Sequence, residues 1–469
     1  MPLPEVSEAR RVMADAVALH EQGKFHDAIA HYIRAVHLDD RDPEVLHAAG
    51  IALGQANKNA EAVRLLSGAL EFGKNVPAVW EDLGMAFLGM RKDGQPMLGN
   101  AERCFYNAVK RDPKRVTGWV HFGTMAYASG NAELGEQRFS RALAIGTRSV
   151  GDKFAQSLVW LIRGQYRTGW KWYECRKAVG NWLMRNRQQS EQKPKALNRQ
   201  DVKRGMRIMV EAEQGQGDAV MVARFLQPFA DQFGVTVVLQ SHNALVDLLR
   251  GALPNIEVVG RDVIPEADGW IPMLSLPYFV GLESPKHLPS PILPFGTSYL
   301  KRHRHIDYAY ADGQRIETYR FGKGPRKERV FLHVRGNAAH TYDFDRSMPS
   351  NDTARALTEH PSVEIVTAAY RPTGHGENGE VLYDEPTWRE TVNTLSTCDR
   401  VVTVDTGLAH VAASMGIPTD ILVPTIPEWR WGFGQTTPWY PSARLIRRTR
   451  WDAWSEAITQ TLPGANVVR

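Results

Sequence analysis

The feature that most constrains the fold is an internal repeat, in which small and aromatic residues recur every 34 positions over about the first 180 residues. Between Ala69 and Ala108 the interval is 39, and the five extra residues fit an insertion in the turn RKDGQPMLGN (91–100). A fixed period of this length predicts stacked supersecondary units rather than a single globular core. The matched pairs are Ala28 with Ala62, Tyr32 with Leu66, Ala35 with Ala69, Gly50 with Gly84, Ala108 with Ala142, and Phe139 with Tyr173.

A 34-residue period with small residues, an aromatic and a terminal proline at fixed places resembles the tetratricopeptide repeat. The resemblance covers about residues 8–180, as four repeats and a partial fifth, and it predicts an all-α solenoid over residues 1–184. Such an array either offers a groove to a bound partner, such as an acceptor substrate, or serves as a scaffold or an oligomerisation surface. The sequence leaves these alternatives open, including a homo-oligomer formed through the repeats.

Length and composition indicate a soluble multidomain protein. A chain of 469 residues is too long for one core, and no apolar run approaches the roughly 18 residues of a membrane span. The N-terminus MPLPEVSEARRVMADAV carries charges where a signal peptide needs an apolar segment. The three scattered cysteines, Cys104, Cys175 and Cys398, suit a reducing compartment. We therefore expect a cytoplasmic protein, and its net charge of +5 weakly favours acidic partners.

After a polar linker at 185–205, strands alternate with helices, which predicts parallel, doubly wound sheets. We predict an N-terminal Rossmann-like domain at 206–296, a connection at 297–328 and a C-terminal Rossmann-like domain at 329–469. A cleft between two such domains, facing the carboxyl ends of the strands, is where a ligand is expected. The predicted strands are 207–211, 235–240, 256–260, 329–334, 363–369, 400–405 and 420–424, with helices at about 218–232, 243–252, 408–415 and 452–462.

The stretch VVTVDTGLAHVAASMGIP (401–418) predicts a buried strand, a tight turn at Asp405-Thr406-Gly407 and a helix. The N–H groups of the first helical turn would form an anion site suited to a diphosphate. Asp405 either fixes the turn or binds the ligand, and His410, one turn into the helix, either contacts the ligand or packs in the core. The alternative is an ordinary strand–helix turn that needs a glycine and a cap.

A second glycine-containing loop, EAEQGQGDAV, carries Gly215 and Gly217 after the first predicted strand. Val220 stands where the dinucleotide fingerprint requires its third glycine, and Gln240 ends the second strand where a ribose-binding acid belongs. A nicotinamide-dependent enzyme is therefore disfavoured. The loop presents Asp218 at the start of a helix, either as a first-turn acid or as a general base.

Two further segments are candidates for ligand contacts. The polar loop VRGNAAHTYDFDRSMP follows the strand at 329–334, and its Asn337 and Arg346 suit sugar and diphosphate contacts, the alternative being a solvated loop. The segment PEWRWGFGQTTPWYPSARLIRR is dense in aromatic residues. Its Trp429 and Trp431 either stack on a base or sugar or pack the loop.

Taken together, these blocks resemble a known family. VDTGLAHVAASMGIPT is similar to the signature of the ADP-heptose:lipopolysaccharide heptosyltransferases, which are GT-B glycosyltransferases, and VEAEQGQGDAVMVARFL is similar to their acceptor-side loop. The order of the repeats and six blocks resembles bacterial tetratricopeptide-repeat glycosyltransferases more closely. The likeness to O-linked N-acetylglucosamine transferases is architectural and more distant.

The resemblance implies that the backbone amides of Thr406, Gly407 and Leu408 hold the diphosphate of a nucleotide-sugar donor, with Asp405 and His410 in the same site. It implies that Asp218 is the base that deprotonates an acceptor hydroxyl for inverting displacement. No cofactor and no metal ion are implied, because helix dipoles and cationic side chains stabilise the leaving diphosphate.

We therefore predict an inverting, metal-independent GT-B glycosyltransferase whose repeats bind or position the acceptor, which is a protein or a glycan. One alternative is a glycosyltransferase acting on modified DNA bases, which the basic runs KRHRH (301–305) and RLIRRTR (444–450) permit. Another is a non-catalytic repeat scaffold with a decayed glycosyltransferase unit. The intact loops argue against decay.

Overall fold

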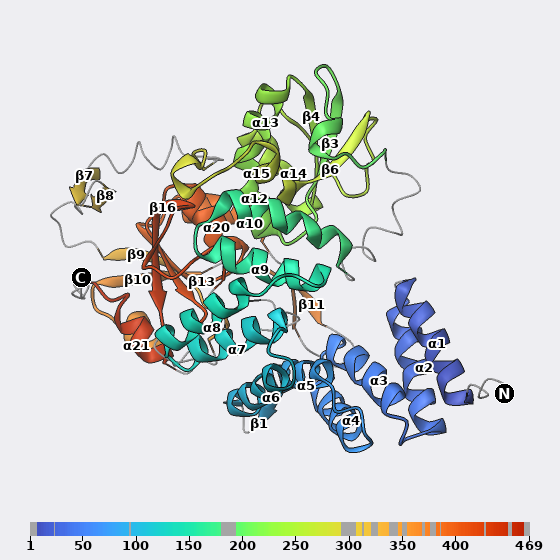
Figure 1. The fold of residues 1–469 in the computed structure, drawn as a ribbon. Helices are drawn as coiled ribbons and strands as arrows, with labels where there is room; N and C mark the ends of the chain where they lie inside the picture. The colour runs from blue at the N-terminus through green and yellow to red at the C-terminus, as the bar shows by residue number, and fades with distance from the viewer. Residues whose placement is uncertain are drawn as a thin grey trace. The chain divides into compact units, whose positions relative to one another are not determined.

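The computed structural model divides by internal contacts into a helical unit and a sheet-containing unit, which are described separately (Figure 1). Among described residues, the helical unit holds 7–160 and 172–179, and the sheet-containing unit holds 161–171 and everything from 194 onward. The predicted domain limits stay predictions. The structure describes residues 7–22, 24–92, 95–179, 194–291, 306–311, 314–319, 327–336, 346–348, 354–367, 371–375, 381–384, 386–425, 428–448 and 453–463.

Helices follow one another over residues 8–178 at the spacing that the repeat predicts, and most of the last helix, α10, belongs to the sheet-containing unit (Figure 1). The second helix of each pair begins at Phe25, Asn59, Leu98, Ala132 and Tyr166, which gives intervals of 34, 39, 34 and 34 residues. The helices are α1 (Glu8–Glu21), α2 (Phe25–Leu38), α3 (Pro43–Gln55), α4 (Asn59–Glu71), α5 (Pro77–Gly89), α6 (Leu98–Arg111), α7 (Val116–Ala128), α8 (Ala132–Ala144), α9 (Val150–Ile162) and α10 (Tyr166–Tyr173), followed by η1 (Glu174–Ala178). A two-stranded ribbon of β1 (Arg91–Lys92) and β2 (Gln95–Pro96) occupies the predicted insertion.

Small residues allow the two helices of each pair to approach closely. A Cβ atom on Gly84 of α5 would lie 2.6 Å from Cε1 of Phe105 on α6, and one on Gly123 of α7 would lie 2.5 Å from Cδ1 of Phe139 on α8. Gly50 packs in the same way against Leu66 in the preceding pair, where a Cβ would lie 2.7 Å from Cγ of the leucine. Both phenylalanines are fully buried, so neither ring can move aside. The repeated glycine and aromatic positions are therefore the packing unit of this array.

The first sheet of the other unit has four parallel strands in the described residues, in the order β5-β4-β3-β6. They are β3 (Arg207–Glu211), β4 (Thr236–Ser241), β5 (Glu257–Gly260) and β6 (Gly269–Pro272). The other elements of this half are η2 (Arg199–Asp201), α12 (Gln216–Val222), η3 (Ala223–Phe225), α13 (Leu226–Phe233), η4 (Asn243–Leu245), α14 (Val246–Ala252), η5 (Met273–Ser275), α15 (Leu276–Phe279) and η6 (Pro285–His287).

The helix expected over 218–232 is interrupted by the 3₁₀ turn η3. Pro228 explains the break, because it has no N–H to donate to the carbonyl of Arg224 one turn earlier. The strand β6 was not predicted.

The second sheet has six strands in the part of the chain described, in the order β10-β9-β13-β14-β16-β15, and its first five are parallel. They are β9 (Glu328–His333), β10 (Val363–Val366), β13 (Arg400–Val404), β14 (Thr419–Val423), β15 (Thr436–Thr437) and β16 (Tyr440–Arg447). The helices are α18 (Arg355–Thr358), α19 (Trp388–Leu395), α20 (Gly407–Ser414) and α21 (Trp454–Thr459). Two antiparallel hairpins pair β7 (Ile306–Ala311) with β8 (Gln314–Tyr319) and β11 (Arg371–His375) with β12 (Val381–Asp384).

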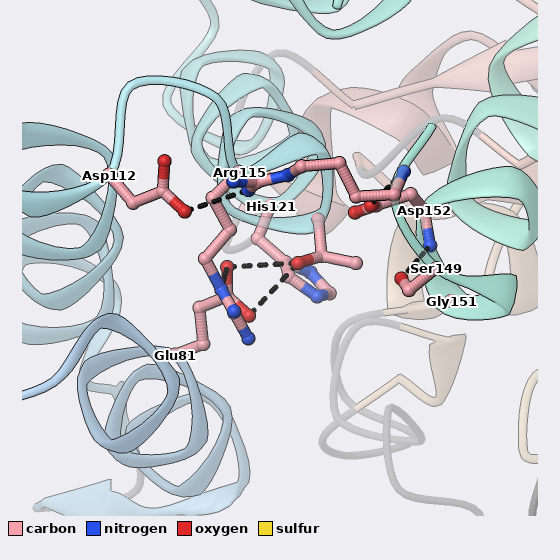
Figure 2. A pocket seen from close by; sticks show the side chains of 9 residues that line it. Glu81, Asp112, Arg115, His121, Ser149, Gly151 and Asp152 are labelled. Atoms are coloured by element: carbon pink, nitrogen blue, oxygen red, sulfur yellow. Dashed lines mark hydrogen bonds and ion pairs between the residues drawn. The ribbon is translucent and has the colours of Figure 1, made fainter. Parts of the chain in front are cut away.

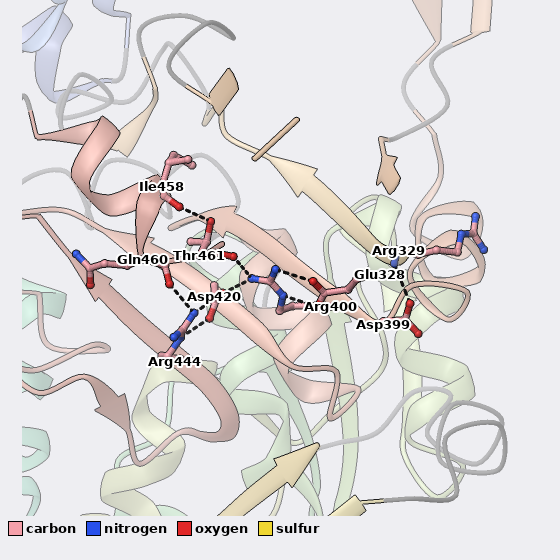
Figure 3. Close-up of polar contacts among 9 residues, drawn as sticks. All are labelled: Glu328, Arg329, Asp399, Arg400, Asp420, Arg444, Ile458, Gln460 and Thr461. Carbon is pink, nitrogen blue, oxygen red and sulfur yellow. Dashed lines mark hydrogen bonds and ion pairs between the residues drawn. The ribbon is translucent and has the colours of Figure 1, made fainter. Parts of the chain in front are cut away.

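An ion network closes the amino-terminal end of this sheet (Figure 3). Arg400 donates to Glu328 at 2.9 and 3.0 Å and to Asp420 at 2.6 Å. Arg444 donates to the same aspartate at 2.6 and 2.8 Å. Charged side chains that are all paired within the protein in this way contribute to structure. The opposite, carboxyl-terminal edge of the sheet is therefore the one available for ligands.

The two strand orders place the functional edge. In both sheets the order reverses beside the first strand of the half, between β3 and β6 and between β9 and β13. Ligands of doubly wound sheets bind outside the carboxyl ends of the strands at such a reversal. The loops after β3 and β13 are the two glycine-containing loops singled out from the sequence. None of the described helices combines the length and the apolar composition of a membrane span.

We expect Gly84→Ala to destabilise the helical unit, because the new Cβ would collide with the fixed Phe105 ring. Overpacking of this kind costs about 1–3 kcal/mol, which exceeds the gain in helix propensity. Gly99→Ala on α6 is the control, since nothing lies within 4 Å of its Cβ position, and it should stabilise by up to about 1 kcal/mol. Urea unfolding followed by circular dichroism measures both. A Gly84→Ala protein as stable as the wild type would contradict the packing argument.

Candidate functional site

The N-terminus of α20 forms one side of the candidate site. Thr406 is the N-cap, in extended conformation, and its side chain makes no capping hydrogen bond. The Thr406 hydroxyl is buried and finds no hydrogen-bond partner among the described residues. The first N–H groups of any helix also lack intrahelical acceptors. A donor set of this kind at a glycine turn suits an anion such as a phosphate.

The loop after β3 forms the other side, where α12 meets α20. A Cβ atom on Gly217 would lie 2.5 Å from Cδ2 of His410 and 3.4 Å from Cα of Gly407. Only glycine fits at position 217, because the two helix N-termini touch there. The two glycine-containing loops predicted from the sequence are therefore brought together, with Gly215 as the N-cap of α12.

Trp388 of α19 connects the same two loops. Its indole Nε1 donates to Oε1 of Gln216 at 2.5 Å, and its ring lies 3.4 Å from the position of a Cβ on Gly407. The indole therefore closes one side of the α20 N-terminus.

Asp218 pairs with Arg430, which follows β14. Oδ1 of the carboxylate accepts from Nε at 2.7 Å and from Nη2 at 2.5 Å. The side chains are 14% and 16% exposed, so the pair is largely shielded from water. Asp218 also occupies the first turn of α12, where a negative charge is favourable.

Glu428 completes a charged cluster around Arg430. Its carboxylate contacts Nη1 of Arg430 and accepts from the Arg430 backbone N–H at 2.8 Å. The pKa of Glu428 is raised to about 7, chiefly by burial; Arg430 opposes this shift, and the nearby Asp405 and Asp218 contribute to it. The Arg430 guanidinium therefore contacts two carboxyl groups, those of Asp218 and Glu428, at the carboxyl edge of the sheets.

His410 is a neutral, packed residue in this structure. Its side chain is 3% exposed, Nδ1 lies 2.9 Å from the Tyr440 hydroxyl, and the ring stacks on Trp431 at 5.0 Å. Burial lowers the pKa of His410 to about 3, assisted by Arg430 and Arg224. These contacts favour the packing interpretation, and the donor-binding role stays a prediction.

Trp429 and Trp431 are both buried, at 5% and 1% exposure. The Trp429 ring meets Trp170 edge-to-face at 5.2 Å, and Trp431 is covered by the His410 ring. Each ring already has a protein partner, which favours packing over stacking on a ligand.

The remaining predicted residues lie at the tips of β9 and β13. Arg346 belongs to a segment that returns to the tip of β9, where Ser347 accepts from Gly336 N at 2.6 Å. Asp405 follows β13 and is half-buried, whereas Leu408 is buried in the first turn of α20. Asn337 lies outside the described residues. Among those described, no three His, Cys, Asp or Glu side chains form a metal-binding group, and the metal-free mechanism stays a prediction.

The helical unit has a cavity of its own, of about 540 Å³ (Figure 2). Glu81 accepts hydrogen bonds from Thr117 at 3.0 Å, and Arg148 donates to Asp112 at 2.7 Å. The lining of the cavity comes from α5, α7, the start of α9 and the turns before α7 and α9. It comprises Glu81, Asp112, Arg115, Thr117, His121, Arg148, Ser149, Gly151 and Asp152. A polar cavity suits a polar ligand better than an apolar one.

Comparison with known proteins finds a family that is similar to part of the second half. The family model of glycosyltransferase family 9 (heptosyltransferase) matches residues 386–463, which include α19, β13, α20 and Arg430. This segment is similar to family 9 glycosyltransferases. The match supports a glycosyltransferase activity in general terms.

Full-length likeness is weaker. Protein FlbA of Caulobacter vibrioides is 22% identical over 455 residues, which span 89% of this chain and 72% of that protein. Among solved structures, the thermophilic TPR protein TTC0263 of Thermus thermophilus is 17% identical, covering 39% of this chain and 97% of its own, with a TM-score of 0.31. YrrB, described as a TPR protein with an unusual peptide-binding site, is 14% identical, covering 39% of this chain and 92% of its own, with a TM-score of 0.27. Because these TM-scores are low, the evidence for the repeat architecture is the series of helix pairs in this structure and not the likeness to solved structures.

Sequence reasoning missed Trp388, Glu428 and Arg430 as site residues. The density of tryptophan, arginine and glycine after β14 marked the segment, but nothing local connects Arg430 with Asp218, 212 residues away.

We expect Glu428→Gln to change the pH dependence of stability. The folded pKa of Glu428 is raised to about 7 from an ordinary 4.5, so its contribution is fully present below pH 4.5 and is lost as the pH rises to 7. The variant should lose this fall in stability and exceed the wild type at pH 8. Urea unfolding followed by tryptophan fluorescence between pH 4.5 and 8 tests this, and parallel curves for the two proteins would contradict it.

Proposed function

We propose that this protein is an inverting GT-B glycosyltransferase that moves a sugar from a nucleoside diphosphate to an acceptor hydroxyl. The observation that supports this most strongly is the meeting of the α20 N-terminus with the Asp218 loop at Gly217, where the strand order of both sheets reverses. An anion site and a carboxylate from opposite sheets are what such a reaction requires. The match to glycosyltransferase family 9 includes α20, whose N-terminus forms the candidate anion site.

The donor diphosphate would lie on the backbone amides at the start of α20, with the Thr406 hydroxyl as an additional donor. Asp218 would take the proton from the acceptor hydroxyl while the new C–O bond forms at the anomeric carbon. The bond from that carbon to the diphosphate oxygen breaks in the same step, and the nucleoside diphosphate leaves with the electron pair. Helix dipole and amides stabilise its charge without moving.

In this proposal the helical unit receives the acceptor, and its polar cavity favours a peptide or glycan with hydrogen-bonding groups. The comparisons give no support to the DNA-base alternative or to the decayed scaffold. Of the two basic runs, 301–305 lies outside the described residues. In the other, Arg444 pairs with Asp420, Arg447 donates to backbone carbonyls and Arg448 lies 3.8 Å over the Trp454 ring. Arginines used in this way are not available to bind phosphates of DNA.

We expect Thr406→Val to weaken donor binding without loss of stability. Its hydroxyl has no partner among the described residues, so the free protein loses nothing, whereas a hydrogen bond to a charged phosphate contributes about 1.5–3 kcal/mol, or about 10–100-fold in affinity. A thermal-shift and titration panel of UDP, GDP and ADP and of their sugars measures this.

Thr419→Val is the control for that panel. It removes a buried hydroxyl that donates to the Ile417 carbonyl at 2.8 Å, at the amino end of β14, so it should lower stability by about 1 kcal/mol and leave donor affinity unchanged. Equal donor affinities in the wild type, Thr406→Val and Thr419→Val would show that the donor does not bind at the Thr406 hydroxyl. A well-folded wild type that binds none of the panel would reject the proposed function.

We expect Asp218→Asn to lower kcat for donor turnover by about 10²–10⁴-fold, the range for loss of a general base, with donor affinity little changed. Release of the nucleoside diphosphate, with water as acceptor, reports turnover. Asp231→Asn on α13 is the matched control, because Asp231 is exposed and accepts only from Gln227 in the same helix among the described residues. Full activity of Asp218→Asn would leave Asp218 as a structural acid of the first turn.

A further inference from the structure

Besides its pairing with Asp218, Arg430 is fixed by contacts with three other residues. Its guanidinium lies 4.2 Å over the Trp429 ring. Its Nη1 and its backbone N–H both contact Glu428, and its carbonyl accepts from Thr437 at 3.1 Å. An arginine anchored through its main chain, its ring face and one nitrogen has little freedom to follow a ligand.

The hydrogen-bonding nitrogens of Arg430 are already used by protein acceptors. Nε and Nη2 donate to Asp218, Nη2 also lies 3.5 Å from Oε1 of Gln214, and Nη1 contacts Glu428. A counter-ion for a diphosphate would direct its donors at the candidate anion site at the α20 N-terminus. Arg430 directs them at the loop of residues 214–218 in the other half.

Both bonds from Arg430 fall on one oxygen of Asp218, and this determines which oxygen remains. Oδ2 accepts no hydrogen bond from the residues that the structure describes, and it lies 3.5 Å from where a Cβ on Gly215 would stand. The absence of a side chain at Gly215 therefore leaves space beside this oxygen. The acceptor hydroxyl would deliver its proton to Oδ2.

We propose that Arg430 is a positioning residue, which fixes the Asp218 carboxylate by its Oδ1 atom so that Oδ2 faces the acceptor. The inference rests on the proposed function, because it takes Asp218 to be the base. It adds that the base of one half is oriented by an arginine of the other half. A planar guanidinium is required for this, since a lysine ammonium cannot direct two parallel N–H groups at one oxygen from a fixed plane.

Arg430→Lys tests the inference, with turnover measured as release of UDP, GDP or ADP from UDP-glucose, UDP-N-acetylglucosamine, GDP-mannose or ADP-glucose. We expect kcat to fall about 100-fold, the loss that a misplacement of about 1 Å causes, while the dissociation constant for the donor changes less than threefold. In the Asp218→Asn background the same substitution should cause no further loss, because residues that act as a unit are not additive.

Arg447→Lys is the matched control. Arg447 holds the same turn by donating to the carbonyls of Trp431, Gly432 and Gly434 at 2.7–2.9 Å, and none of its described contacts involves Asp218. It should lower the melting temperature and leave kcat unchanged.

Three results would overturn the inference. A tenfold weaker donor affinity at unchanged kcat would make Arg430 a diphosphate ligand. A lower melting temperature at unchanged kcat would make it structural only. A further loss of kcat in the Asp218→Asn background would show that it acts without Asp218. A wild type that turns over none of these donors rejects the proposed function itself, and the inference with it, whereas turnover that Arg430→Lys does not reduce rejects the inference alone.

Discussion

The close approach of two helix N-termini at Gly217 is the constraint on which the candidate site depends. A Cβ there would meet the His410 ring at 2.5 Å, so any larger residue would separate the loop of the first sheet from α20. Separation would also remove the contacts of Arg430 with Asp218 and of Trp388 with Gln216, since each of these contacts joins residues 216–218 to the second half. The helical unit packs in the same way, because Gly50, Gly84 and Gly123 each lie against a large buried side chain of the next helix.

The two ends of the second sheet differ in role: the amino end contributes to stability, and the carboxyl end carries the candidate site. At the amino end, Arg400 and Arg444 share the Asp420 carboxylate, and these charges are matched within the protein. At the carboxyl end, the Thr406 hydroxyl is unmatched among described residues, and Glu428 has a pKa near 7 because it is buried with other acids. Unmatched donors and perturbed carboxyl groups store unfavourable free energy, and their placement at one edge is typical of functional sites.

Local patterns made much of the fold and the two loops predictable. Apolar runs followed by glycine turns predicted β3 and β13, and the 34-residue register predicted the interval between successive helix pairs, including the longer interval at the insertion. The strands β6 and β16 were missed, because GWIP is too short to show a pattern and β16 is interrupted by Pro441 and by arginines. The pairing of Asp218 with Arg430 was beyond reach, because it depends on how two sheets meet and leaves no signal in either segment.

The aromatic residues after β14 have a role that the sequence left open. Tyr166 and Trp170 lie in the register of the fifth repeat, and their ring centroids are 5.9 and 6.4 Å from that of Trp439. The Trp170 ring also contacts Trp429. Trp429 in turn supports the guanidinium of Arg430, which holds Asp218. The last helix of the repeat pattern is therefore part of the core beneath the site, which explains why residues 161–171 belong to the sheet-containing unit. Residues 161–171 continue the repeat register but bury their aromatic side chains in this core, so their removal together with the repeats before them would loosen the support of Arg430.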